Sequence, residues 1–598
     1  MLDATLSEAH LEVQRNFRAG YYFRAFEDAR AALLDYPDDV GLKHMAVLCL
    51  VRGKAFAAAE ALFDKFNLGQ NKHEDILALS GKLAKSKIED RGAAATPDDY
   101  GGAAELYATA YRQTGGSYSG VNAASLWYMA GHKPKAQALA ENILKANPPD
   151  NASAQMQYYF HATRGECLFI LGDMEAAEAA LGRALAIDPH NYAARASTVK
   201  QFTMLGGGAL PACALSLKVP HCSHYTGHLF HVGEKRAERS LTEAETETLA
   251  ADIKTLIAQT PISAGFGALA AGADILFAEA ILAYGADLHL VLPVPVADFR
   301  RLSVTPMGAF WEGRFDAALA KATSLRIILD DPGDFDALDL KMGSLIAMGL
   351  AALTADSLAA DAVQLSVMDK DSADVSMAGT RQDIQLWHDV ARETKNIAWP
   401  HPRQEKPRVT LSNTDGRQFK AMLFTDLKGY GKLPDRALPD IVSHIFEPMA
   451  EKCRALDVPP LQMKSWGDGL FLVFDEAMAA AEAAFALMDC FESCIEGFSA
   501  LHGADVALRV GVHFGPVWER SDPFTDMANL YGRHVTIAAR LEALAVPGTI
   551  CVSENFAAVL AMTPEALSAN IICDYVGQAT SEKEETIFSL YSLRKRRV

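Results

Sequence analysis

Short, largely apolar runs recur through the later part of the chain, with a polar residue, glycine or proline within two positions of each end. They cover Leu288–Leu292, Val363–Met368, Phe419–Phe424 and Leu470–Phe474. Runs of this length between turn residues predict buried β-strands. Around the first two runs the order is strand, glycine-rich turn, helix, strand, which is typical of a parallel α/β sheet. We therefore expect such a domain over residues 218–397.

The first third of the chain has another pattern, in which small residues return at fixed intervals. Each copy has a glycine, an alanine five residues later and a proline seventeen residues later: Gly20, Ala25 and Pro37; Gly172, Ala177 and Pro189; and a weaker Gly131, Ala136 and Pro148. Glycine opens a turn between two helices, alanine permits close helix packing, and proline ends the second helix. The spacing resembles the second half of a tetratricopeptide repeat.

The resemblance implies an α-solenoid over residues 1–215, because such units must stack to bury their apolar faces. Between Leu79 and Gly120 the glycine, alanine and proline spacing of the repeat is not recognisable. This segment resembles the TRAF-binding-like helical region of some multidomain proteins. A protein partner on the concave face is one expectation, and a role as a spacer is the alternative.

The predicted sheet domain resembles Rossmann-like nucleotide sensors of the SLOG type. Its candidate ligand residues lie in turns before helices or in the strand that leads to them: Gly265, Gly267, Gly272, Gly379 and Thr380. Free amides at a helix N-terminus can hold a phosphate, so a nucleotide-like ligand is one interpretation. Close packing of helix on sheet is the other interpretation of these glycines.

Composition narrows the class of protein. A chain of 598 residues with net charge −19 suggests several domains and argues against general nucleic-acid binding. The sequence lacks a long uninterrupted apolar run and a signal-peptide pattern, so we expect no membrane span. Nine cysteines without a C-x-x-C motif indicate reduced thiols and a cytoplasmic protein.

Two aspartates stand where apolar runs give way to glycines. Asp426 precedes Leu427-Lys-Gly429-Tyr430-Gly, and Asp468 lies between Gly467 and Gly469. A lone aspartate in such a place is usually a turn residue. Two carboxylates beside flexible backbone amides, however, suit Mg²⁺ and phosphate oxygens together.

These aspartates belong to five ordered blocks of sequence: F-x-D-x-x-G-Y, K-x-x-G-D-G, R-V-G-V-H-x-G, G-x-x-V-x-x-A-A-R-L-E and P-G-x-I-x-V-S. Their order resembles the catalytic domain of class III adenylyl/guanylyl cyclases. The resemblance implies a ferredoxin-like α+β domain over residues 417–598. A proline-rich linker over residues 398–416 precedes it, so the fold class is multidomain α and α/β.

The resemblance also implies a reaction and a site. ATP would be converted to 3′,5′-cyclic AMP and pyrophosphate, with two Mg²⁺ or Mn²⁺ ions per site held by Asp426 and Asp468. The expected phosphate-binding residues are Leu427, Lys428, Gly429, Tyr430, Arg509 and Lys583. Arg540 and Thr536 are the expected catalytic residues, and Lys464 and Asn529 the base-binding ones. Spacing places Asn529, Arg533, Thr536 and Arg540 on one helical face. The resemblance implies that this helix reaches the site of a partner subunit in a homodimer.

Two positions depart from the family pattern. Thr536 replaces the asparagine that orients the ribose, and Asn529 replaces the aspartate that reads the base in adenylyl cyclases. Lys464 matches the purine-contacting lysine of ATP users, so ATP is favoured, while GTP or a pyrimidine triphosphate remains an alternative. Two further functions stay open: a degenerate domain that binds nucleotide or dimerises, and a scaffold built on the repeats.

Overall fold

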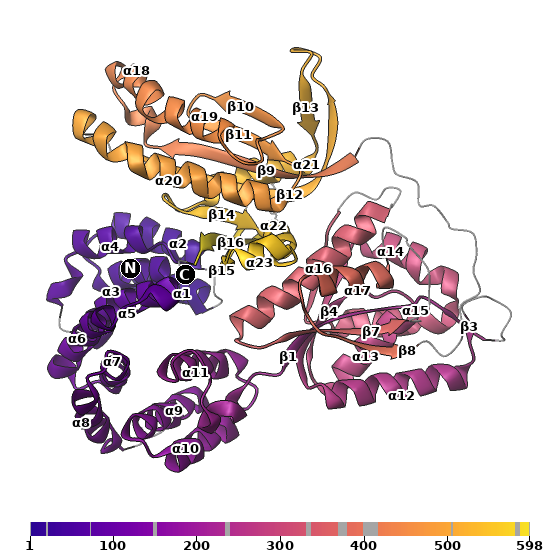
Figure 1. Ribbon diagram of the computed structural model, residues 1–598, viewed down its shortest axis with the longest axis horizontal. Helices are drawn as coiled ribbons and strands as arrows, with labels where there is room; N and C mark the ends of the chain where they lie inside the picture. The colour runs from indigo at the N-terminus through magenta and orange to yellow at the C-terminus, as the bar shows by residue number, and fades with distance from the viewer. Residues whose placement is uncertain are drawn as a thin grey trace. The chain divides into compact units, whose positions relative to one another are not determined.

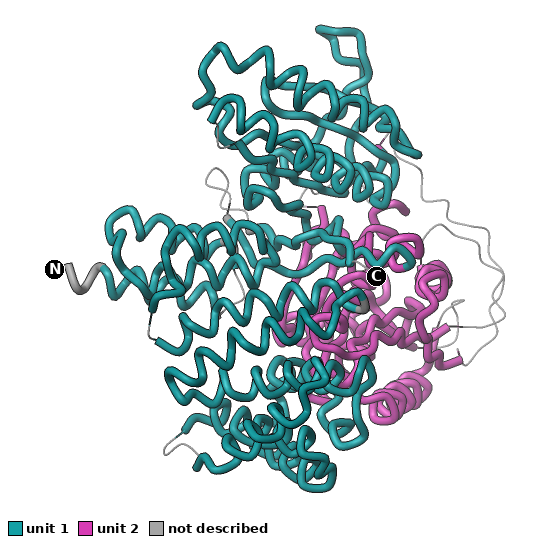
Figure 2. The backbone as a smooth tube through the Cα atoms, turned by 60° about the vertical axis from the view of Figure 1, so that its left-hand side comes forward, with its two compact units in different colours: residues 1–218, 418–557, 568–598 teal, residues 219–417, 558–567 magenta. Residues whose placement is uncertain are grey.

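The computed structural model describes residues 2–596 except 19–21, 72, 148–151, 234–239, 330–336, 369–378, 399–416, 504–505 and 581–586. It divides into two compact units. Unit 1 comprises Met1–Lys218, Gln418–Ala557 and Ser568–Val598, and unit 2 comprises Val219–Arg417 and Ala558–Leu567 (Figure 2). The four-part division expected from the sequence stays a prediction.

The N-terminal part of unit 1 is entirely helical where it is described. Its helices are α1 (Leu2–Arg18), α2 (Tyr22–Asp35), α3 (Val40–Arg52), α4 (Phe56–Lys65), α5 (Glu74–Arg91), α6 (Pro97–Thr114), α7 (Ser117–Met129), α8 (Lys133–Leu144), α9 (Ala154–Leu171), α10 (Met174–Ile187) and α11 (Tyr192–Leu205). Neighbouring helices pack as antiparallel pairs along an arc (Figure 1).

The predicted repeat residues act as expected where they are described. Gly172 ends α9 in the left-handed conformation, with φ 88°. Such a φ is costly for any residue with a Cβ atom, which explains glycine at the turn. Ala177 and Ala136 are fully buried between helices. Gly20 and Pro148 lie outside the described residues.

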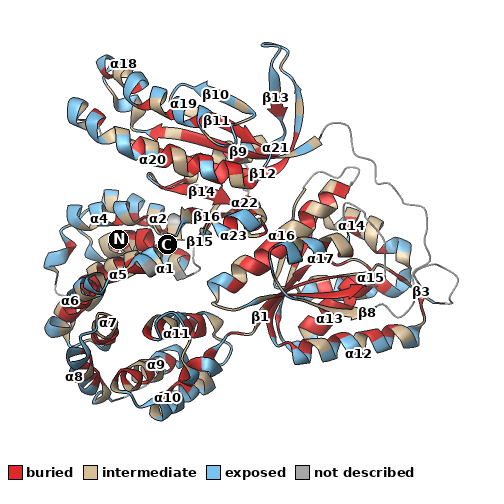
Figure 3. Ribbon diagram, in the orientation of Figure 1, coloured by how far each residue is buried: buried red, intermediate tan, exposed pale blue. Residues whose placement is uncertain are grey.

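The C-terminal part of unit 1 contains an eight-stranded mixed sheet in the order β10-β11-β9-β12-β14-β16-β15, with β13 paired to β12. The strands are β9 (Arg417–Lys428), β10 (Gln462–Trp466), β11 (Gly469–Phe474), β12 (Ala507–Ser521), β13 (Ala528–Tyr531), β14 (Ile550–Ser553), β15 (Ile571–Thr580) and β16 (Ile587–Lys595). The apolar runs predicted as strands form β9 and β11, whose central residues are buried (Figure 3).

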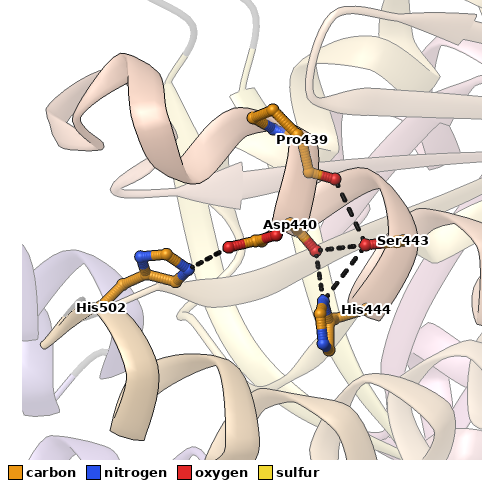
Figure 4. A network of polar contacts seen from close by, with 5 residues as sticks. All are labelled: Pro439, Asp440, Ser443, His444 and His502. Atoms are coloured by element: carbon orange, nitrogen blue, oxygen red, sulfur yellow. Dashed lines mark hydrogen bonds and ion pairs between the residues drawn. The ribbon is translucent and has the colours of Figure 1, made fainter.

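The helices of this domain are α18 (Leu438–Ile441), α19 (Glu447–Arg454), α20 (Ala477–His502) and α21 (Arg533–Leu544). The chain then passes from unit 1 to unit 2 within α22 (Glu554–Ala561) and back at the end of α23 (Pro564–Ser568). A π-helical turn, Val442–Phe446, joins α18 to α19. His502 at the end of α20 bonds Asp440 (Nε2–Oδ2 3.0 Å), while His444 and Ser443 bond the Asp440 carbonyl (Figure 4). These bonds tie the end of α20 to the first turn of the α18 segment.

Within unit 1, one apolar cluster includes residues of both the helical repeats and the mixed sheet. Its buried members come from α3 to α5 and from α21, β14, β15 and β16, among them Leu50, Leu79, Leu541, Cys551 and Leu590. Arg594 of β16 forms ion pairs with Asp574 of β15 and with Asp90 of α5. The repeats therefore share a core with the C-terminal end of α21.

Unit 2 holds a six-stranded parallel sheet in the order β6-β5-β4-β1-β7-β8. The strands are β1 (His221–Gly227), β4 (Ile262–Gly267), β5 (Asp287–Leu292), β6 (Ser324–Ile327), β7 (Ala362–Met368) and β8 (Thr394–Ala398). The short strands β2 (His231–Val232) and β3 (Ser240–Leu241) pair separately. The helices are α12 (Glu243–Gln259), α13 (Ala273–Tyr284), α14 (Val296–Ser303), α15 (Ala309–Lys321), α16 (Ala337–Ser357) and α17 (Thr380–Asp389).

The strand order reverses at β1, which has β4 on one side and β7 on the other. Such a switch point is where open α/β sheets bind ligands. Of the described residues, one helix, α16, has the length and composition to cross a membrane, and more than half of its most apolar window is buried. The expected fold class is confirmed: helical repeats, a parallel sheet domain and a C-terminal domain of a mixed sheet with helices.

Candidate active site

Asp426 and Asp468 lie together at one end of the mixed sheet. Asp426 is in β9, which continues through Lys428, so the expectation that the strand ends at Asp426 is wrong by two residues. Asp468 lies in the turn between β10 and β11, where Gly467 has φ 61°. Strand pairing sets Thr425 opposite Leu470 and so brings both aspartates to the same edge. Burial first, and then the negative charge of Asp426, raises the pKa of Asp468.

Arg509 of β12 lies against this pair. Its guanidinium forms an ion pair with Asp426 and a second one with Glu542 of α21, at 3.0 Å from Nη2 to Oε1. Burial raises the pKa of Glu542 to about 7, and Arg509 opposes that shift. The sequence did not predict a role for Glu542, although this residue stands in the block A-A-R-L-E. The structure thus adds a third carboxylate to the group.

The aspartate pair suits the expected divalent ions. Two neighbouring carboxylates repel each other, and a divalent cation between them relieves that repulsion. Oxygen ligands of this kind suit Mg²⁺ and Mn²⁺. Over the described part of the chain, no set of three or more His, Cys, Asp and Glu side chains is arranged to hold a metal. The donor pair fits the expected ions, with the rest of the ligands to come from outside the protein.

The two base-binding residues expected from the sequence contact each other. Lys464 of β10 donates from Nζ to Oδ1 of Asn529 at 2.6 Å, and the Leu530 amide donates to the same oxygen at 3.0 Å. The Asn529 amide nitrogen lies 3.4 Å from Oδ2 of Asp522. Two donors on one side and a carboxylate on the other fix the orientation of the side-chain amide. Asn529 therefore has its acceptor engaged and an N–H left to offer.

The expectation that Asn529 lies on the catalytic helix is wrong. Asn529 is in β13, opposite Arg520 of β12, and α21 begins only at Arg533. Gly532 precedes the helix with φ 137°, a backbone conformation that ends the strand and that only glycine adopts easily. The spacing that joined Asn529 to the helix was therefore fortuitous.

Thr536 and Arg540 do lie on α21, one helical turn apart. Thr536 is exposed and Arg540 is half-buried. Helical periodicity puts both on one face.

The expected phosphate-binding segment has mixed geometry. Leu427 is buried and Lys428 exposed at the end of β9, Gly429 is left-handed with φ 96°, and Tyr430 opens a short 3₁₀ turn. A left-handed glycine between a strand and a turn can present successive amides to an anion. Phosphate binding by this segment stays a prediction, and Lys583 lies outside the described residues.

The candidate ligand residues of unit 2 separate into two kinds. A Cβ on Gly265 would meet Ile281 Cδ1 at 2.4 Å, and one on Gly267 would meet the Tyr225 ring at 2.7 Å. Packing therefore accounts for these two glycines. Gly272 (φ 114°), before α13, is also required by packing, because a Cβ there would lie 2.7 Å from the His228 carbonyl oxygen. Gly379 (φ 116°) precedes α17, and Thr380 is buried at the start of that helix. A ligand at these helix starts stays a prediction.

Comparison with known proteins bears on two parts of the chain. Residues 417–582 match the family model of the adenylate and guanylate cyclase catalytic domain, and residues 22–127 match that of the Tetratricopeptide Repeats-Sensor. A Rhizobium meliloti (strain 1021) protein with the provisional name adenylate cyclase 3 is 28% identical over 142 residues. The matched segment spans 23% of this chain and 23% of that relative's length.

Solved structures give low global similarity. The adenylyl cyclase CyaB from P. aeruginosa is 19% identical with a TM-score of 0.26, covering 30% of this chain and 94% of that one. The guanylate cyclase domain of RhGC from Catenaria anguillulae, in complex with GTP, is 14% identical with a TM-score of 0.25, covering 30% and 97%. The family models are the finding that defines the class: the chain contains a class III adenylate/guanylate cyclase catalytic domain. The same polypeptide carries a tetratricopeptide-type sensor region.

Proposed function

We propose that the protein converts a nucleoside triphosphate to its 3′,5′-cyclic monophosphate and pyrophosphate. The observation that carries the proposal is the grouping of Asp426, Asp468 and Arg509 at one edge of the sheet in the matched domain. A degenerate domain would be expected to have lost one of these charges. The matched repeats make a regulated enzyme the better interpretation than a scaffold alone.

The proposed reaction forms a bond between the ribose 3′-oxygen and the α-phosphorus and breaks the bond from that phosphorus to the bridging oxygen of pyrophosphate. The 3′-hydroxyl proton leaves as the bond forms. Two Mg²⁺ or Mn²⁺ ions, when held by Asp426 and Asp468, would stabilise the attacking and leaving oxygens. Arg509 is placed to exchange its carboxylate partners for phosphate oxygens. Arg540 supplies a planar fork for charge that develops on the phosphorus oxygens, and Thr536 a hydroxyl toward the ribose.

A homodimer with shared sites is part of this proposal. Large apolar side chains are exposed on the β12–β13 hairpin: Trp518, Phe524, Met527 and Tyr531, of which Phe524 is 95% exposed. Exposed apolar groups gathered on one hairpin favour a protein interface. Arg540 of one subunit would then complete the site formed by the aspartates of the other.

Base preference has two candidates. Lys464 favours ATP, as in the family. Asn529 supports the second candidate, GTP or a pyrimidine triphosphate, because its acceptor oxygen is engaged by Lys464 and by the Leu530 amide. The Asn529 side chain then has only its N–H groups to offer to a base. These donors suit a base with a carbonyl group better than the amino group of adenine.

The deciding experiment incubates the purified protein with ATP, GTP, CTP and UTP separately, with Mg²⁺ and with Mn²⁺, and identifies cyclic products by mass. A cyclic product that requires Asp468 supports the proposal, and the base with the highest kcat/KM names the substrate. No cyclic product from any of the four, with nucleotide bound to the folded protein, would favour the degenerate sensor.

Complementation tests the shared site. Asp426→Ala and Arg540→Ala chains should each be inactive, and a mixture that exchanges subunits should recover part of the activity, because one composite site per heterodimer keeps both groups. Folded variants that exchange subunits without recovery would contradict a site shared between chains.

We further propose a cytoplasmic protein whose repeats bind a protein partner and whose parallel sheet binds a nucleotide-like ligand. The repeat match supports the first and the helix starts at the switch point support the second. Limited proteolysis with and without nucleotides would detect the second ligand.

A further inference from the structure

One face of β12 is built to receive α21. Residues two apart on a strand share a face, so Arg509, Gly511, His513 and Gly515 point the same way. A Cβ on Gly511 would lie 2.3 Å from the Glu542 backbone nitrogen, and one on Gly515 would lie 2.2 Å from Nδ1 of His534. The block R-V-G-V-H-x-G is thus a seat for the helix, in which the glycines let it lie directly on the strand.

Between the two glycines, His513 bonds the helix. Its Nε2 lies 2.8 Å from Nδ1 of His534, and its Nδ1 lies 2.7 Å from Oγ of Ser553 at the end of β14. The two imidazole rings are almost parallel, at 7°, with centroids 5.1 Å apart. Ser553 Oγ in turn accepts from the Phe556 amide at 3.2 Å. A chain of hydrogen bonds therefore joins α21, β12, β14 and the start of α22.

Both histidines are buried, with His513 2% and His534 8% exposed. Burial, and then the neighbouring His534, lower the pKa of His513 well below its ordinary value. A bond between two imidazole nitrogens needs one N–H donor and one lone pair, so the proton positions on the two rings depend on each other. Such a bond sets distance and direction, whereas an apolar contact would let the helix slide.

The other end of α21 is held by Arg509. Its Nη1 donates to the Ala543 carbonyl at 3.4 Å, and Nη2 pairs with Glu542. Thr536 and Arg540 lie between these two attachments. The block G-x-x-V-x-x-A-A-R-L-E does not specify the residue at position 534, which is histidine in this chain.

We propose that His534 is a positioning residue, which through His513 sets the place of α21 along β12 and so of Thr536 and Arg540. The inference rests on the proposed cyclase function for its kinetic consequence, and on α21 alone for its structural one. His534 lies on α21, whereas the expected base-binding residues Lys464 and Asn529 lie on β10 and β13. Its loss should therefore lower kcat and leave KM nearly unchanged.

The experiment compares His534→Leu with His534→Asn in the full-length protein. Leucine fills the space without a hydrogen bond, while the asparagine amide can place a polar atom where Nδ1 lies. We expect kcat to fall at least tenfold in His534→Leu with KM within threefold, and to recover to within threefold of wild type in His534→Asn. An exposed histidine of the same domain, changed in His444→Leu, is the control and should leave kcat unchanged.

Hydrogen exchange of the α21 amides gives a readout that needs no enzymatic activity. Exchange in the first two turns of α21 should be faster in His534→Leu than in wild type and in His534→Asn. If wild type makes no cyclic product, the proposed function fails while this comparison still decides the positioning role. Equal exchange in all three proteins overturns the inference, as does faster exchange with unchanged kcat in an active enzyme.

A second pair of variants covers the case in which His534→Leu does not fold. His513→Gln keeps a polar group near Nε2, toward His534, and His513→Asn keeps one near Nδ1, toward Ser553. The inference requires His513→Gln to retain the higher kcat and the slower exchange of α21. The opposite order would mean that the bond to Ser553, and not the bond to the helix, is the one that matters.

Discussion

Two pairs of aspartates, one in each unit, have opposite surroundings. Asp426 and Asp468 are partly exposed at the sheet edge of the cyclase domain. Arg509 forms one ion pair with Asp426 and another with Glu542. Asp274 and Asp383 lie buried in the first turns of α13 and α17, where neutral groups donate to them. Thr226 Oγ1 donates to Asp383 at 2.8 Å, and the Ala270 amide to Asp274 at 3.3 Å.

The difference lies in what keeps each carboxylate in place. Burial raises the pKa of Asp274 to about 7 and that of Asp383 to about 6, with backbone or hydroxyl bonds opposing the shift. Burial also raises the pKa of Asp468, but there an arginine opposes it. An arginine can be replaced by a metal ion, since both are cations, whereas a buried acid bonded to neutral donors is most stable when protonated. The first pair is therefore suited to chemistry and the second to holding helix starts.

The largest expected effect comes from exchanging one carboxylate for its amide in each pair. Asp426→Asn should lower kcat by on the order of 10³-fold or more, because removing a preorganised charge at a reacting centre costs about that much. Asp383→Asn should change kcat less than threefold. Both are measured by cyclic-nucleotide production under saturating triphosphate, with circular dichroism to confirm folding. Similar losses in the two variants would contradict the separation of roles.

Sequence alone identified the cyclase domain because its blocks place particular residues at fixed spacings. The structure brings Arg509 to Asp426 and Lys464 to Asn529, while the roles of these residues stay predictions. The interpretation failed at Asn529, since a left-handed Gly532 separates strand from helix and residue spacing does not reveal a backbone conformation. Glu542 and His534 were missed because their roles depend on partners in β12, more than twenty residues away along the chain. In unit 2 the sequence does not distinguish a glycine required by packing, such as Gly265, from one that would bind a ligand.

A smaller effect is expected from Glu542→Gln. This variant removes the ion pair between Arg509 and Glu542 and leaves Asp426 and Asp468 unchanged. Arg509 now divides between Glu542 and Asp426. Without the second carboxylate it stays with Asp426 and competes with the activating cation. Partly exposed ion pairs contribute up to about 1 kcal/mol, or roughly fivefold. The Mg²⁺ concentration for half-maximal activity should rise about that much, read from a metal titration at saturating substrate.

The control for this titration is Asp274→Asn, which changes a carboxylate of the buried pair. It leaves Asp426, Asp468 and Arg509 intact, so its half-maximal Mg²⁺ concentration should match that of wild type. An unchanged titration in Glu542→Gln would mean that Arg509 does not compete for the cation.

The smallest effect concerns the pH dependence of stability in the buried pair. The pKa of Asp274 is about 7 in the folded protein against 3.8 for the free side chain. Between these two pH values the folded state keeps a proton that the unfolded state has lost. Unfolding therefore releases a proton, and the stability of the folded protein falls as pH rises from about 4 to about 7.

Asp274→Asn mimics the protonated acid and should therefore remove the part of this loss of stability that is due to Asp274. We expect similar melting temperatures near pH 4, and at pH 8 a gain on the order of 5 °C for the variant, by calorimetry of the full chain. The matching change in the partly exposed pair, Asp468→Asn, should give a smaller gain of the same sign, since the pKa of Asp468 is also raised but Arg509 opposes the rise. A variant curve parallel to wild type from about pH 4 to pH 8 would show that Asp274 is charged in the folded protein, and the contrast between the two pairs would then be wrong.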